Sequence, residues 1–482
     1  MGIEARRWQT KAQNPWSTKD NPAAGGCCNS VTDPLRSVGK RGAGTWLSSA
    51  RRSEPSAWPN EDGGPHMMKK KVATIAGLGV ALLSAAPARA QTTTVACNDT
   101  SVLPNAVYMA GSSAFEPTLA QLAVQIEAKQ GISIVYDPIS SCSGVVDIAD
   151  STQTLSGTAH YYTVASVDGG ATGSVTTNSC TLASSTKPLI GVSDVAYDSC
   201  GAALAAAGLP TTIPATIGEW HGPVQAMLII VPEANVTTTA MSMEQAAAIW
   251  GCGAKGNQTP FIDETAIQQR SSTSGTQIMF AKAIGVPETA FKGVSNSSGG
   301  NLITSLLAVP NPQAAIGILA ADAYASKRST LNAVAFRGKG QTKAYYADSD
   351  ANAVDKKNVR DGHYVIQGPL HFFTALSGGQ PSATAKKVLE WISGATPIDV
   401  ADANNTNYIS TVASLGDVPQ CAMKVQLDKD GGNFSPFTPP VSCNCFFDKA
   451  VTKATAAPAG CVACTSDSQC SGGKRCQTGY CE

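Results

Sequence analysis

The sequence predicts an α/β fold followed by a small disulfide-rich C-terminal tail. From Cys97 to about residue 418, apolar strand-like runs alternate with amphipathic helical patterns, which favours strands and helices in layers with mostly parallel sheets. After residue 420 the chain becomes rich in Gly, Pro and Cys. The 482 residues, with 43% hydrophobic and 15% charged side chains, suit a globular chain of two or three domains.

The individual elements follow from local pattern. Leu119, Leu122 and Ile126 recur at helical spacing, and Gly131 marks the end of that helix, as Gly285 does for another. The run "QAMLIIVPE" is apolar throughout, as in a strand buried on both faces. The expected strands span 105–111, 132–140, 225–233 and 314–324, and the expected helices span 116–131, 242–251, 274–285 and 382–394.

The first 90 residues differ from the rest. Residues 67–90 combine a lysine-rich start, an apolar run and the Ala-Arg-Ala pattern that precedes Gln91, which is typical of a secretory signal peptide. We therefore expect translation to start at Met67 or Met68, with residues 1–66 a mis-assigned or disordered extension. The mature product is expected to be periplasmic, secreted or at the cell surface.

Charge limits the possible partners. Residues 1–90 hold 13 of the 35 Lys/Arg and 6 of the 35 Asp/Glu, which leaves 22 basic and 29 acidic residues and a net charge of −7. Because phosphate backbones demand a basic surface, no nucleic-acid partner is expected. No transmembrane segment is expected in the mature chain either.

Thirteen cysteines follow residue 90, and in an exported protein they predict disulfides. The odd number leaves at least one thiol unpaired or paired with another chain. Residues 421–482 hold eight of them and have too little apolar material for a core, so cross-links are expected to hold this tail. Zinc is disfavoured there because the tail contains no His.

The stretch "RSSTSGT" (270–276) precedes a predicted helix and has the chemistry of an anion socket. Arg270 supplies a cation, Ser274 and Thr276 supply hydroxyls, and Gly275 lets the backbone approach a ligand. A capped helix behind a polar loop is the alternative. Two other Ser/Gly turns, 111–113 and 140–144, also follow strands, and such turns line the ligand crevice of open α/β sheets.

Six motifs in order resemble the phosphate-binding protein of the bacterial phosphate ABC transporter, a type II periplasmic binding protein. They are "GSSAFEP", "ISIVYDPISSCSG", "LIGVSDVAY", "GPVQAMLIIVP" with "MSMEQAAAIWGCGA", "RSSTSGT" and "AAIGI", and together they cover about residues 100–420. The resemblance implies two α/β lobes joined by a hinge of crossing strands. Lobe I would comprise 97–228 and 363–420, and lobe II 229–362.

The resemblance also implies ligand contacts and a role. The ligand would be phosphate or a related oxyanion. The protein would be a monomer, and it would deliver the ligand to an ABC permease. Asp194 would accept a hydrogen bond from a protonated oxyanion, which sulfate at neutral pH cannot offer; a helix cap is the alternative for this residue. The implied ligand-binding residues are Ser113, Phe115 through its N–H, Ser141, Asp194, Arg270, Ser274, Gly275 and Thr276.

The sequence departs from the family pattern at several positions. Ser272 stands where the family has an Asp that restrains the Arg, and Ala114 stands where a Thr is common, so Ser112 or Ser113 would supply that hydroxyl. Cys142 lies beside Ser141 and is expected in a disulfide. Extra sequence, including 166–180, precedes Asp194.

No enzyme, cofactor or metal site is predicted. The sequence has no GxSxG nucleophile motif, no phosphate-binding Walker loop and no dinucleotide fingerprint in which GxGxxG follows a strand and opens a helix. A phosphatase would need a metal set or nucleophile that is not visible. His371 lies in an apolar setting and is expected to be a packed residue. The alternative function is an extracellular or surface-attached protein that reuses the phosphate-binding fold, with the Cys-rich tail as an interaction module.

Overall fold

The computed structural model describes residues 95–164, 174–397 and 400–482. The expected signal peptide (67–90) and the N-terminal extension (1–66) lie outside this part of the chain. Within it, no helix is long and apolar enough to cross a membrane.

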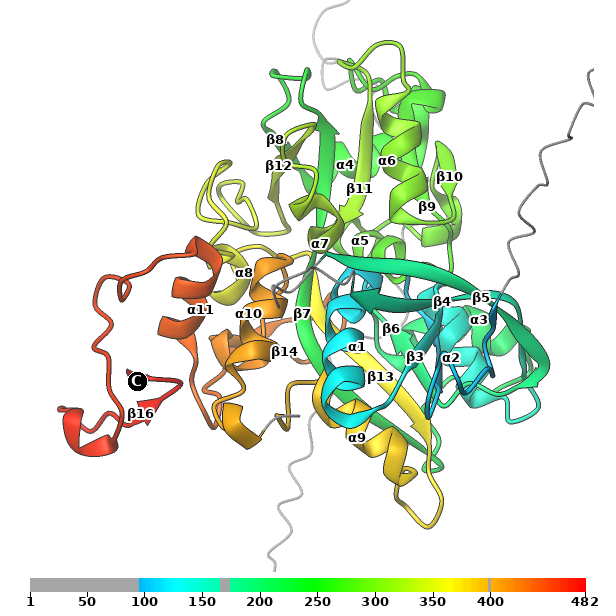
Figure 1. The fold of residues 1–482 in the computed structure, drawn as a ribbon. Coiled ribbons are helices and arrows are strands. Elements are labelled where there is room, and N and C mark those ends of the chain that lie inside the picture. Colours follow the sequence, from blue (N-terminus) through cyan, green and yellow to red (C-terminus); the bar gives the residue numbers. More distant parts are fainter. Residues whose placement is uncertain (1–94, 165–173, 398–399) are drawn as a thin grey trace, which may run out of the picture. The chain divides into compact units, whose positions relative to one another are not determined.

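A sheet of thirteen strands organises the described chain (Figure 1). Its order is β1-β5-β4-β3-β2-β6-β13-β7-β11-β9-β10, with β12 beside β7 and β8 beside β12. The strands are β1 Val95–Ala96, β2 Val107–Gly111, β3 Ile134–Asp137, β4 Leu155–Val164, β5 Val175–Thr186, β6 Ile190–Ser193, β7 Ile217–Pro232, β8 Ala240–Ser242, β9 Ile267–Arg270, β10 Val294–Asn296, β11 Ile316–Ala320, β12 Leu331–Arg337 and β13 Gln367–Ala375.

The predicted α/β class is confirmed, but the expectation of mostly parallel pairing is wrong. β2, β3 and β6 pair in parallel, as do β9, β10 and β11. β7 pairs antiparallel with β11, β12 and β13, and β4 pairs antiparallel with β3 and β5. Apolar runs such as "QAMLIIVPE" show that a strand is buried on both faces and do not specify its direction.

The long strand β7 belongs to both halves of the sheet. Residues from Ile217 to Ala226 pair with β13, whereas those from Met227 to Pro232 pair with β11 and β12. β7 therefore connects the β1–β6 group to the β8–β12 group, as Figure 1 shows.

The helices begin and end largely where capping chemistry predicts. Gly131 and Gly285 adopt left-handed conformations just after α1 and α5. Ser242 forms a capping box at the start of α4. The helices are α1 Glu116–Gln130, α2 Ser141–Ala149, α3 Gly201–Ala206, α4 Met243–Cys252, α5 Gly275–Ile284, α6 Gly299–Leu307, α7 Ala321–Ala325, α8 Lys357–Arg360, α9 Ala383–Ile392, α10 Thr406–Ser414 and α11 Asn444–Thr452.

Six disulfides join twelve cysteines of the described residues. The pairs are Cys97–Cys180, Cys142–Cys200, Cys421–Cys443, Cys445–Cys461, Cys464–Cys476 and Cys470–Cys481. The eight tail cysteines thus pair among themselves, and Cys142 is disulfide-bonded, as predicted. Cys464, Cys470 and Cys481 lie close together because two disulfides neighbour one another there.

The tail is held by more than its cross-links, which corrects the expectation drawn from its composition. Phe447 of α11 and Cys443 are fully buried in the main hydrophobic core. Arg360 donates to Asn444 and Asp448 from the body of the chain. The tail also contains two short two-stranded sheets, β14 Val425–Leu427 with β15 Phe434–Pro436 and β16 Cys476–Gln477 with β17 Tyr480–Cys481.

Candidate functional site

Three Ser/Gly turns that are far apart in sequence meet in the structure. The backbone N–H of Cys142 donates to the carbonyl of Thr273 at 3.1 Å, which joins the 140–144 turn to the 270–276 turn. The Arg270 guanidinium donates from Nη2 to Ser113 Oγ at 3.0 Å, which joins the latter turn to 111–113. Each turn follows a strand, β2, β3 or β9, and each leads into a helix, α1, α2 or α5.

Ser141 lies at the centre of this junction. Its Oγ accepts from the backbone N–H of Gly275 at 3.0 Å and of Asp194 at 3.3 Å, and it donates to Asp194 Oδ2 at 3.2 Å. A Cβ added to Gly275 would stand 2.6 Å from that Oγ and 2.7 Å from the Asp194 Cβ. Only glycine permits this close approach of α5 to Ser141 and Asp194.

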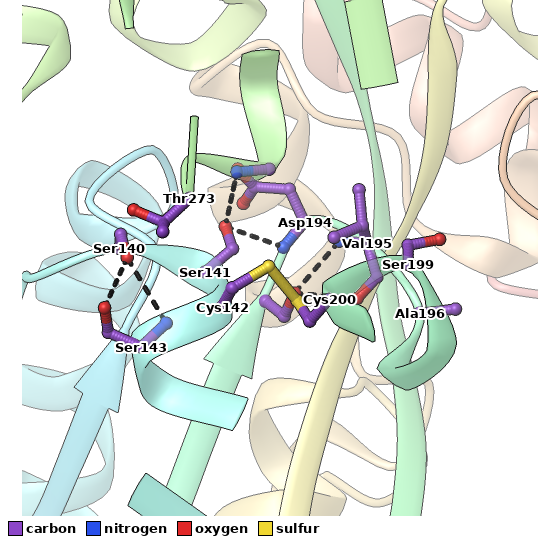
Figure 2. Close-up of a disulfide and its surroundings, with 12 residues drawn as sticks. Ser140, Ser141, Cys142, Ser143, Asp194, Val195, Ala196, Ser199, Cys200 and Thr273 are labelled. Atoms are coloured by element: carbon purple, nitrogen blue, oxygen red, sulfur yellow. Dashed lines mark hydrogen bonds between the residues drawn. A yellow bond between two sulfur atoms is a disulfide. The ribbon is translucent and has the colours of Figure 1, made fainter. Parts of the chain in front are cut away.

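The Cys142–Cys200 disulfide lies at the same junction. Figure 2 shows it beside Ser141 and Asp194, with Thr273 on the neighbouring turn. Ser140 caps α2 by accepting from the N–H of Ser143 at 3.3 Å. The disulfide therefore ties the start of α2 to the segment that follows Asp194.

Arg270 is the cation of the site and is only 2% exposed. It donates hydrogen bonds to three neutral acceptors of the described chain: Ser113 Oγ, the carbonyl of Asn296 at 3.3 Å and the carbonyl of Ser297 at 3.0 Å. Within the described ranges no carboxylate forms a salt bridge with it. Burial lowers the pKa of Arg270, and the negative charges of Asp194 and Asp322 oppose that shift.

A cavity of about 500 Å³ opens beside Arg270. Ser113 and Ala114 line it from the first turn, and Gly299 and Gly300 line it from the start of α6. His160 and Thr177, from the β4–β5 hairpin, line it as well. The extra sequence between the second turn and Asp194 thus builds part of the cavity wall.

The remaining predicted residues are buried and do not line the cavity. Phe115 is fully buried and stacks at a tilt on Phe372, with 5.4 Å between ring centroids. Ser274 is buried directly before α5, and its side chain does not cap the helix. Of the eight predicted residues, Ser113 and Arg270 line the cavity, whereas the other six do not.

Among the described residues, two buried side-chain atoms of the junction, Asp194 Oδ1 and Thr276 Oγ1, have no hydrogen-bond partner within the chain. Buried polar atoms are normally hydrogen-bonded, so both atoms have hydrogen-bonding capacity left. Burial raises the pKa of Asp194, and hydrogen bonds together with the charge of Arg270 limit the rise. A carboxyl group with a raised pKa can either accept or donate, depending on pH.

The departures from the family pattern have visible consequences. Ser272 is exposed, so the position of the missing Asp does not restrain Arg270 here. Carbonyls of Asn296 and Ser297 orient the guanidinium instead. The hydroxyl of Ser113 contacts Arg270, whereas Ser112 Oγ accepts from the N–H of Ala114 at 3.1 Å.

A fourth Ser/Gly turn, which was not predicted from the sequence, also borders the site. "SNSSGG" (295–300) follows β10 and leads into α6, and Ser298 caps that helix by accepting from the N–H of Asn301 at 3.1 Å. The same strand, Ser/Gly turn and helix pattern that singled out the other three turns would have found it. It supplies the carbonyl of Ser297 to Arg270 and the two glycines to the cavity.

Comparisons with known proteins give only remote similarities. No family model and no curated protein sequence matches the chain. Among solved structures, a substrate-binding protein with bound phosphate from Clostridium perfringens has 14% identity and a TM-score of 0.43 over 65% of this chain and 99% of its own. An ABC-type phosphate transport receptor from Vibrio cholerae has 11% identity and a TM-score of 0.39 over 65% and 99%. The periplasmic molybdate-binding protein of Azotobacter vinelandii has 10% identity and a TM-score of 0.33 over 65% and 98%. Similarity at this level does not identify a ligand.

Proposed function

We propose that this chain is an exported solute-binding protein that binds phosphate or a related oxyanion at the junction of the Ser/Gly turns. One observation carries the proposal: Arg270 is buried, faces a cavity and has only neutral hydrogen-bond partners. A buried cation without a carboxylate partner is costly, and an anionic ligand would offset that cost.

The surrounding groups suit an oxyanion. The hydroxyl groups of Ser113 and Thr276 are the proposed donors, since Ser141 Oγ already donates to Asp194 Oδ2 and the Gly275 N–H already donates to Ser141 Oγ. The N-terminus of α5 adds partial positive charge. Asp194 does not line the cavity itself, but its Oδ1 would accept the proton that the ligand retains if the ligand reaches the junction beside Ser141. An ionised Asp194 would accept from monohydrogen phosphate and would meet sulfate with an unsatisfied charge.

We propose further that binding closes two lobes, 97–228 with 363–420 and 229–362, around β7 as hinge. Support comes from the division of β7 pairing between β13 and the β11–β12 pair. Ser113 and Arg270 come from the two different sides of that division. The six disulfides accord with an oxidising compartment, and an ABC permease would receive the ligand.

A surface role carried by the Cys-rich tail is not favoured. Helix α11 buries Phe447 in the main core and anchors its Asp448 to Arg360. The tail is thus integrated with the body of the chain rather than displayed from it.

Calorimetry with phosphate and sulfate tests the proposal. At pH 8, where Asp194 is more ionised, phosphate should bind and sulfate should bind much more weakly. Arg270→Gln should weaken phosphate binding at least about 30-fold, because it removes a buried charge that faces the ligand. Arg337→Gln, which removes an exposed arginine paired with Glu244, should leave the affinity unchanged. Absence of phosphate binding, or equal affinities in the wild type and Arg270→Gln, would refute the proposal.

A further inference from the structure

A second cavity, of about 420 Å³, lies where the tail meets the β7–β13 ribbon. It shares no lining residue with the candidate oxyanion site. Two histidines and several carboxylates line it, including His221, His371, Glu219 and Asp430. Neither the oxyanion site nor the proposed hinge closure uses these side chains.

The ribbon places three of them on one face. Glu219 and His221 are two residues apart on β7, so their side chains emerge on the same side of the strand. His371 on β13 is the direct cross-strand partner of His221, and the two imidazole ring centroids are 4.9 Å apart. Cross-strand partners share a face, so all three side chains converge.

Two imidazole nitrogens approach the same carboxylate oxygen. Glu219 Oε1 is 2.6 Å from His371 Nδ1 and 3.6 Å from His221 Nε2. One donor atom from each residue lies within 4.8 Å of the other two. Ligand atoms around a tetrahedral zinc ion with bonds near 2.1 Å stand roughly 3.4 Å apart, so small side-chain rotations would complete the geometry.

Asp430 lies near the second ring nitrogen of His371. It comes from the loop between β14 and β15, and its Oδ2 accepts from the N–H of Ala196 at 2.8 Å and from Ser199 Oγ at 2.6 Å. Its Oδ1 lies 4.0 Å from His371 Nε2, a buried nitrogen without a hydrogen-bond partner. A histidine that ligates a metal through one ring nitrogen usually donates the other N–H to a carboxylate, and Asp430 is placed for that role.

We propose that Glu219, His221 and His371 bind a divalent transition-metal ion of the zinc type, with Asp430 as the outer-shell partner of His371. Two imidazoles and one carboxylate form a nitrogen and oxygen donor set that suits Zn²⁺, whereas Ca²⁺ and Mg²⁺ prefer oxygen ligands alone. Three protein ligands leave at least one coordination position for water. Because Asp430 belongs to the tail, the bound ion would also fasten the 428–430 turn to the ribbon.

Calorimetric titration of the untagged, fully oxidised full chain with Zn²⁺ tests the site. Since other parts of the full chain can also bind Zn²⁺, the readout is the difference between variants. His221→Ala removes a side chain that is 55% exposed, so it should not disturb folding, and it should abolish one equivalent of Zn²⁺ binding. Asp430→Asn should keep that equivalent but weaken it about 10- to 100-fold.

The matched control is His363→Ala. His363 is 50% exposed and contacts one carboxylate, Asp361, at 2.7 Å, but no second histidine shares that carboxylate. It should retain the full zinc stoichiometry, and Mg²⁺ should not compete for the lost equivalent. Zn²⁺ should also raise the unfolding temperature of the wild type more than that of His221→Ala. Identical zinc stoichiometry and affinity in the wild type and His221→Ala would overturn the proposal.

Discussion

Two regions of this protein bury charged side chains, and they differ in whether these side chains have oppositely charged partners. Around Asp348 every charge has a partner: Lys356 Nζ lies 2.7 Å from Oδ1, and Arg328 Nη2 lies 2.6 Å from Oδ2. Around Arg270, within the described residues, the guanidinium donates only to neutral acceptors, and Asp194 interacts with the hydroxyls of Ser112 and Ser141 and forms no salt bridge.

The difference distinguishes a structural cluster from a candidate binding site. Charges that satisfy one another inside the chain have no remaining capacity for a ligand. Buried charges without an oppositely charged partner destabilise the folded state. Such charges are expected where a bound ligand provides the missing partner. The following predictions test that contrast, from the largest expected effect to the smallest.

Asp348→Ala should cause the largest loss of stability. It leaves Lys356, only 3% exposed, as an unpaired buried cation, which typically costs about 3–5 kcal/mol in the free energy of unfolding. Urea denaturation measures the loss. Glu244→Ala removes an exposed carboxylate that is paired with Arg337, and it should have little effect. A loss from Asp348→Ala no larger than that of Glu244→Ala would show that the cluster is not structural.

Asp417 should make stability depend on pH. Its side chain is fully buried, and burial raises its pKa from 3.8 to about 7, against the opposing hydrogen bond that Thr118 donates at 2.9 Å. The folded state therefore keeps a proton that the unfolded chain releases. The stabilising contribution is complete below about pH 4 and is lost as the pH rises to about 7, by at most about 1.4 kcal/mol per pH unit.

Asp417→Asn should remove this contribution, because the amide stays neutral throughout. Urea unfolding at pH 4, 5.5 and 7 should give a flatter pH dependence for the variant than for the wild type. Parallel curves for the two proteins would contradict the assigned protonation of Asp417.

Arg270→Met should change stability least. The desolvation of a buried arginine is unfavourable, and without a carboxylate partner little electrostatic attraction offsets it. Replacement by an apolar residue of similar length should therefore lower the free energy of unfolding by at most about 1 kcal/mol without ligand. Phosphate at 100 times its dissociation constant should stabilise the wild type by about 2.7 kcal/mol and should leave the variant unchanged. A ligand-free loss as large as that of Asp348→Ala would place Arg270 with the structural charges.

Local sequence pattern was sufficient for four of the eleven described helices, α1, α4, α5 and α9, and for the chemistry of the turns. Helices α1 and α5 end at the glycines that were expected to stop them, and α9 matches its amphipathic pattern. The Ser/Gly turns were found because a turn that leads into a helix has a recognisable local composition. The same criterion, applied once more, would have found the turn before α6.

The pairing of distant residues could not be obtained in this way. Ser113 meets Arg270 across 157 positions, and Glu219 meets His371 across 152. His371 was expected to be a packed residue, and it is 4% exposed, but its apolar neighbours in sequence gave no sign of the carboxylate that faces it.

The sequence by itself determined the α/β alternation, the helix ends, the content of the Ser/Gly turns and the pairing of the eight tail cysteines among themselves. These properties depend on residues that are close along the chain, where backbone geometry and capping act. Only the tertiary structure decided the mixed strand directions, the burial of Arg270 without a salt bridge in the described chain, and the proximity of Glu219, His221 and His371. Those properties depend on which strands become neighbours, and that is a result of burying the whole core at once.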